Sequence, residues 1–141
     1  MFKKINLQLV ISYLGLLPFL IIIIDNFFFK FFDSNIVNKF SIFYSIIIFV
    51  FIGAMNWNLK KNLPFFLILL GFFPSILSVF IVILFLYSQT VIHYIIILFI
   101  IQLVLDNFNY KEQNDRLIYF ILRVPLTFFI ILFLIIIQLQ F

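Results

Sequence analysis

The stretch LIYFILRVPLTFFIILFLIII, residues 117–137, decides the class of this protein. A helix that crosses a bilayer needs about 20 consecutive, mostly apolar residues, and this stretch supplies them. One charged residue, Arg123, interrupts it, and a guanidinium cannot be deprotonated to escape hydrocarbon. We therefore interpret the stretch as a membrane-spanning helix whose arginine must reach water, a lipid headgroup or a polar partner.

Four more apolar runs precede it in this chain of 141 residues. Hydrophobic residues make up 67% of the chain and charged residues 10%, against about 45–50% and 25% in soluble domains. The composition predicts an all-α membrane protein with five transmembrane helices and short loops, folded as a single domain over residues 1–141. The expected spans cover residues 5–24, 40–57, 65–86, 90–105 and 117–137, and the polar residues 25–39 form the first loop.

Lysine and arginine residues outside the spans predict the topology. If all five runs cross, Lys30 and Lys39 lie on one side of the membrane, and the remaining positive residues lie on the other. These are Lys3, Lys4, Lys60, Lys61, Lys111 and Arg116. If the fourth and shortest run did not cross, the count would be balanced. Because positive residues collect on the cytoplasmic side, the sequence favours five spans, a cytoplasmic N-terminus and an outside C-terminus. The net charge of +4 therefore reflects topology and implies no nucleic-acid partner.

This topology brings several polar residues and one tryptophan to the cytoplasmic leaflet. They are Asn56, Trp57, Gln102, Asp106, Arg123 and Thr127. Arg123 lies about six residues, or ~9 Å, inside the fifth span. Two interpretations are open: a polar pocket in which Arg123 binds an anionic group, or a structural pair with Asp106 that anchors the fifth helix. We favour the pair, because a carboxylate at a helix C-terminus gains from a nearby cation.

Small residues and prolines in the spans predict close helix packing and kinks. They are Gly15, Pro18, Gly53, Gly71, Pro74, Ser75 and Pro125. Small residues let helices approach closely in lipid. Each proline within a helix frees a main-chain carbonyl, which neighbouring groups must satisfy inside a membrane. We expect Ser75 and Thr127 to do so near Pro74 and Pro125.

The residue inventory argues against an enzyme. The chain has no cysteine, and its single histidine, His93, has no ligands at metal-binding spacing, so we expect no metal and no cofactor. No carboxylate lies deep in a span, and no nucleophile, zinc or phosphate-binding motif is present. The expected partners are membrane lipids, with other membrane proteins or a second copy of the chain as further candidates.

Four short segments carry a family resemblance. They are Gly15–Phe19 (GLLPF), residues 51–58 (FIGAMNWN), Pro74-Ser75, and Leu122-Arg123 with Leu126-Thr127. Together they resemble bacterial membrane proteins of unknown function related to mitochondrial transmembrane protein 69. Ala54 and Asn58 stand where that family has glycines, so close packing at the end of the second span is less expected here. The resemblance implies a small multi-pass protein of the bacterial inner membrane and brings no activity with it.

These observations lead to two hypotheses about function. The first is a non-catalytic accessory, assembly or lipid-interacting component of the inner membrane. The alternative is a small transporter or channel subunit, in which Asn56, Gln102 and Arg123 line a vestibule open to the cytoplasm.

Overall fold

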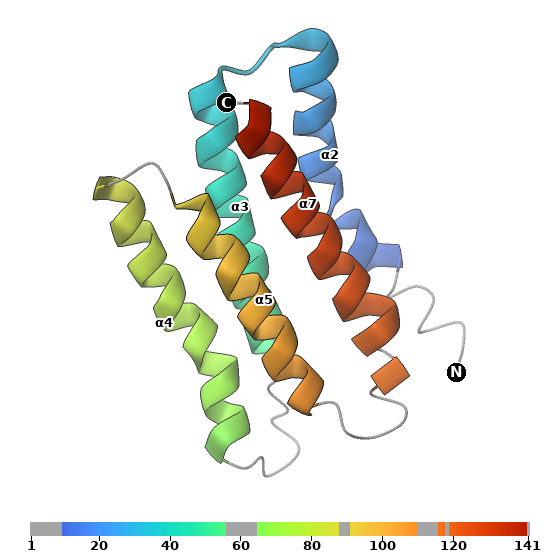
Figure 1. Cartoon of the computed structure of the whole chain (residues 1–141), viewed down its shortest axis with the longest axis vertical. Coiled ribbons are helices and arrows are strands. Elements are labelled where there is room, and N and C mark those ends of the chain that lie inside the picture. Colours follow the sequence, from blue (N-terminus) through green and yellow to red (C-terminus); the bar gives the residue numbers. More distant parts are fainter. Residues whose placement is uncertain (1–9, 56–64, 88–90, 110–115, 118, 141) are drawn as a thin grey trace. The chain divides into compact units, whose positions relative to one another are not determined.

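A computed structural model describes residues 10–55, 65–87, 91–109, 116–117 and 119–140. Its elements are α2 (Leu17–Ile24), the π-helical turn η1 (Asp25–Phe29), α3 (Ser34–Ala54), α4 (Phe65–Tyr87), α5 (Ile92–Asn109), the π-helical turn η2 (Tyr119–Arg123) and α7 (Val124–Gln140). Figure 1 shows their order along the chain. The described residues contain no strand, and the predicted all-α class is confirmed.

Four helices are long and apolar enough to cross a membrane. They cover Val10–Phe29, Ser34–Ala54, Phe65–Tyr87 and Tyr119–Leu139. They correspond to the first, second, third and fifth predicted spans. The fourth predicted span corresponds to the shorter apolar helix Ile92–Phe108. At 1.5 Å per residue this helix is about 26 Å long, slightly less than the ~30 Å of a hydrocarbon core.

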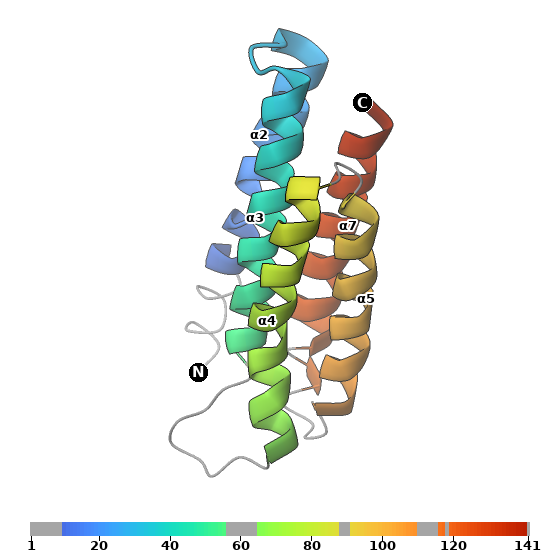
Figure 2. The same ribbon diagram turned by 90° about the vertical axis from the view of Figure 1, so that its left-hand side faces the viewer.

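The polar residues 25–39 are mostly helical, which corrects the expected loop. The first long helix runs on to Phe29 and α3 already begins at Ser34, so only a short connection remains (Figure 2). Asp25 allows this short connection because its buried carboxylate accepts hydrogen bonds from the main-chain N–H groups of Phe31 (3.3 Å) and Phe32 (3.1 Å). Lys30 adopts the left-handed conformation, with φ of 53°, where the chain leaves η1.

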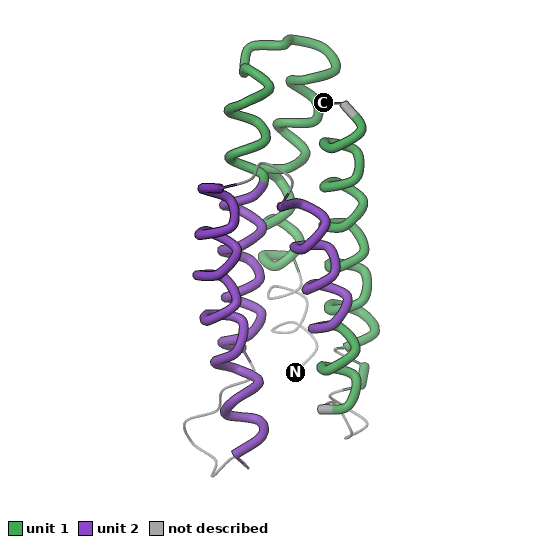
Figure 3. Tube along the Cα trace, turned by 60° about the vertical axis from the view of Figure 1, so that its left-hand side comes forward, with its two compact units in different colours: residues 1–41, 103–141 green, residues 42–102 purple. Residues whose placement is uncertain are grey.

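The chain forms two compact units (Figure 3). Residues 1–41 with 103–141 make up unit 1, and residues 42–102 make up unit 2. The boundary passes through α3 and α5, each of which contributes to both units. The prediction of a single domain stays a prediction.

Unit 1 is held together by packing between α2 and α7, which run side by side in Figure 1. The rings of Phe19 in α2 and Phe133 in α7 lie 6.0 Å apart between centroids. Phe19, Ile130 and Leu134 are completely buried. Because lipid offers no hydrophobic driving force for helix association, such packing contacts carry the stability of the pair.

Unit 2 contains a very close approach of α3 to α4. A Cβ atom added to Gly53 would lie 2.5 Å from Cγ of Pro74 and 3.1 Å from the main-chain oxygen of Gly71. Any side chain at position 53 would collide with α4, so this close approach requires a glycine, as expected from the place of Gly53 in the small-residue pattern. Phe43 packs edge-on against Phe85 of α4, with ring centroids 5.6 Å apart, so the two helices are antiparallel neighbours (Figure 2).

The prolines act in different ways. Gly15 and Leu16 form a turn, and Pro18 follows in the first turn of α2, where its missing N–H is tolerated. Pro74 lies inside α4. There the hydroxyl of Ser78 donates a hydrogen bond to the Pro74 carbonyl at 2.6 Å. This carbonyl differs from that of Leu70, four residues before the proline, which Pro74 leaves without its helical partner, so the role expected of Ser75 stays a prediction.

Candidate functional site

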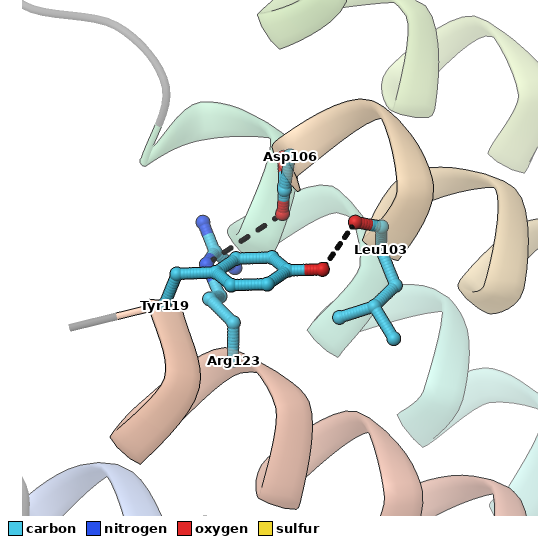
Figure 4. Close-up of polar contacts among 4 residues, drawn as sticks. All are labelled: Leu103, Asp106, Tyr119 and Arg123. Atoms are coloured by element: carbon cyan, nitrogen blue, oxygen red, sulfur yellow. Dashed lines mark hydrogen bonds and ion pairs between the residues drawn. The ribbon is translucent and has the colours of Figure 1, made fainter. Parts of the chain in front are cut away.

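The candidate site in unit 1 is centred on an ion pair between Asp106 and Arg123. Asp106 lies in the last turn of α5, and Arg123 ends the π-helical turn η2. The Nε atom of Arg123 is 3.6 Å from Oδ2 of Asp106 (Figure 4). Their side chains are 4% and 2% exposed, so both charges are enclosed by the protein. The structure thus contains the pair that the sequence suggested.

Tyr119 adds a second link between the same two segments. It lies one turn before Arg123, and both side chains reach from η2 toward α5 in Figure 4. The Tyr119 hydroxyl donates a hydrogen bond to the main-chain oxygen of Leu103, at 2.9 Å. Sequence reasoning missed this residue. Its spacing of four from Arg123 was the available signal, because residues at i and i+4 share a helical face.

The π-helical geometry of η2 is connected with Pro125, which follows two residues later. Proline has no N–H, so the carbonyl four residues before it, that of Ile121, loses its usual helical partner. The hydroxyl of Tyr13, in the first helix, donates to this carbonyl at 2.6 Å. Tyr13 thus has the role that the sequence assigned to Thr127. Single π-turns inside α-helices are often found at functional sites.

Of the other predicted site residues, two lie in the described part of the chain and two lie outside it. Gln102 is 5% exposed and lies one turn before Asp106 in α5, which puts both on one face of that helix. Thr127 is 4% exposed and lies one turn after Arg123 in α7. Asn56 and Trp57 lie outside the described residues. Within unit 1, the described contacts join Arg123 to Asp106, and the unpredicted Tyr119 to Leu103 of the same helix.

The chemistry of this arrangement follows from its groups. The guanidinium of Arg123 carries only N–H donors, so it offers Asp106 a positive charge and hydrogen-bond donors. Enclosed beside Asp106, it forms a pair without net charge, which lowers the cost of keeping either group inside an apolar helix. In the part of the chain that the structure describes, no three His, Cys, Asp or Glu side chains are grouped as metal ligands would be.

Comparison with known proteins gives one family. Neither a curated protein nor a solved structure matches the chain. A family model described as a protein of unknown function, DUF3429, matches residues 6–139 and so covers all the helices described above except the last residue of α7. Because that match extends over nearly the whole chain, this protein belongs to the DUF3429 family of proteins of unknown function.

Proposed function

We propose that this protein is a multi-pass component of the bacterial inner membrane with an accessory, assembly or lipid-interacting role and no catalytic activity. The Asp106–Arg123 pair then has a structural role, because it fixes the start of the last helix to the end of α5. Membrane lipids are the constant partners of the protein, and other membrane proteins or a second copy are further partners.

The burial of the ion pair is the observation that carries this proposal. An arginine that binds a ligand must be reachable, whereas Arg123 is 4% exposed and lies beside a carboxylate that is itself almost fully enclosed. Removing one member of a buried pair leaves an uncompensated charge, with a typical cost of about 3–5 kcal/mol. A penalty of this size is expected if the pair holds the start of the last helix against the end of α5.

The finer parts of the proposal have separate supports. The family match is compatible with the resemblance to relatives of mitochondrial transmembrane protein 69, because residues 6–139 include all four segments that carry the resemblance. The bacterial inner membrane follows from that resemblance. The cytoplasmic N-terminus and outside C-terminus follow from the distribution of lysines.

The experiment compares the membrane levels of four forms of the protein in bacterial cells: wild type, Arg123→Gln, Asp106→Asn, and the double variant. For a structural pair we expect each single variant to be depleted by degradation, because a buried charge is left unpaired. The double variant contains no unpaired charge and should recover most of the wild-type level. Arg116→Gln, the same substitution at an exposed arginine, is the matched control and should stay at the wild-type level.

The alternative function is a small transporter or channel subunit. The observation that favours it is the burial of two polar side chains, Gln102 and Thr127, within apolar helices, because polar groups inside a membrane often mark a solute pathway. The alternative predicts that purified protein in liposomes carries protons, potassium or phosphate, and that Arg123→Gln abolishes this flux while the variant still inserts. Flux that persists in this variant would contradict it, and flux in the wild type that Arg123→Gln abolishes would contradict the accessory role.

A further inference from the structure

Unit 1 contains an apolar pocket of about 260 Å³ between α2 and the first two turns of α3. Ile21 and Ile22 form part of its α2 wall, Ile36 and Phe40 part of its α3 wall, and Phe32 closes it from the connection. Ile22 is 8% exposed, whereas Ile21, Phe32 and Ile36 are 50–58% exposed. The pocket is therefore deep on one side and open on the other to the surroundings of the protein.

The surroundings at this place are hydrocarbon, because the pocket walls belong to the helices Val10–Phe29 and Ser34–Ala54, both suited to cross a membrane. An unfilled space of this size would deprive its lining of dispersion contacts. Every lining residue is apolar, so water has no hydrogen-bonding partner there. A flexible hydrocarbon chain is the occupant that such a pocket suits.

Lys39 lies where it can bind the headgroup of a lipid whose hydrocarbon chain fills the pocket. It is exposed and lies five residues after Ser34, about 7.5 Å into a spanning helix, immediately before Phe40 of the pocket wall. A lysine at this depth extends its ammonium group toward the lipid phosphates. Among the residues that the structure describes, Lys39 forms no ion pair, so a phosphate oxygen can take that position.

The charges near the pocket favour an anion. Lys30 and Lys39 are both exposed, against one exposed carboxylate, that of Asp33. The carboxylate of Asp25 is buried and accepts two main-chain hydrogen bonds, so it is not exposed to a headgroup. An ammonium near the membrane surface contributes about 1 kcal/mol to attraction of anionic lipid.

We propose that this pocket binds one acyl chain of an anionic phospholipid whose phosphate pairs with Lys39. The inference deepens the lipid-interacting role proposed above and requires that α2 and α3 span the membrane. It does not depend on the Asp106–Arg123 pair.

Fluorescence quenching by lipids with brominated tails tests the proposal. In a Trp57→Phe background, which removes the only tryptophan, Phe40→Trp places a reporter in the pocket wall. Ile47→Trp is the control, because Ile47 is 63% exposed, lies outside the pocket lining and is about equally far from the middle of α3. Each protein is reconstituted in phosphatidylcholine vesicles with increasing amounts of brominated phosphatidylglycerol.

We expect the pocket reporter to reach half-maximal quenching at about a five-fold lower fraction of brominated phosphatidylglycerol than the control reporter. Lys39→Gln should abolish this difference, Lys39→Arg should keep it, and brominated phosphatidylcholine should not produce it. Equal quenching of both reporters by phosphatidylglycerol would overturn the proposal, as would a preference that survives Lys39→Gln. Absence of quenching at both positions would instead contradict the spanning helices, and with them the proposed function.

Discussion

Tyr13 donates its hydroxyl hydrogen to the main-chain oxygen of Ile121 at 2.6 Å, and this bond ties the first helix to the last. Pro125, one turn further along the chain, is the chemical cause of this bond. It has no N–H to donate to the Ile121 carbonyl, as a residue at this position in a helix normally would. A membrane interior offers no water for that carbonyl, so a hydroxyl from another helix takes the place of the missing donor.

This relationship predicts that Tyr13→Phe destabilises the protein by about 1 kcal/mol, the usual worth of one hydrogen bond. In a Pro125→Ala background the same substitution should cost much less, because the restored N–H of residue 125 can bond to the Ile121 carbonyl. Unfolding in mixed detergent micelles, followed by circular dichroism, measures both costs. Equal costs in the two backgrounds would show that the Tyr13 hydroxyl does not compensate for the proline.

The approach of α3 to α4 predicts a strong effect of a single methyl group. Gly53→Ala would place a Cβ atom 2.5 Å from Cγ of Pro74, so the helices must separate or tilt. We expect a loss of about 1–3 kcal/mol in unfolding free energy, as for other overpacked cores. Ala54→Val adds two methyl groups to the exposed neighbouring position and should have little effect. Similar losses in both variants would contradict the close contact.

The short connection before α3 predicts a graded response at Asp25. Asp25→Ala leaves the N–H groups of Phe31 and Phe32 without their acceptor, and we expect it to destabilise the protein by about 1–3 kcal/mol. Asp25→Asn keeps one acceptor oxygen and should cost less. Hydrogen exchange at the two amides is the direct readout: both should exchange faster in the alanine variant, and unchanged exchange would exclude the carboxylate as their partner.

The five-span topology predicts the location of three sites along the chain. A reporter protein fused after Gln89 or after Phe141 should be located outside the cytoplasm, and one fused after Gln113 should be located inside it. The result at Gln113 is decisive for α5, because this short helix must cross for residues 89 and 113 to lie on opposite sides. A cytoplasmic C-terminus would exclude five spans.

The helices were predictable because run length and apolarity are local properties of the sequence. The start of α3 at Ser34 was not, since Asn35, Asn38 and Lys39 lower the hydropathy while their main chain still forms helical hydrogen bonds. Asp25 explains the difference, because its carboxylate makes a short connection possible through contacts six and seven residues away.

The charged residues of the candidate site could be predicted from the sequence, whereas its tyrosines could not. Asp106 directly follows one apolar run and Arg123 interrupts another from the same side, so their pairing follows from the cost of leaving either charge isolated. Tyr13 and Tyr119 gave no such signal, because tyrosines are common near membrane interfaces. Their contacts depend on which helices are neighbours and on the π-turn before Pro125, and neither can be read from hydropathy.

The structural role of the Asp106–Arg123 pair is the central claim, and a double-mutant cycle of Asp106→Asn and Arg123→Gln in purified protein tests it most directly. The measurement is the free energy of unfolding in mixed micelles. We predict losses of about 3 kcal/mol for each single variant and a double variant no less stable than either, giving a coupling energy of at least ~3 kcal/mol. Additive losses, or single losses below about 0.5 kcal/mol, would contradict a structural lock.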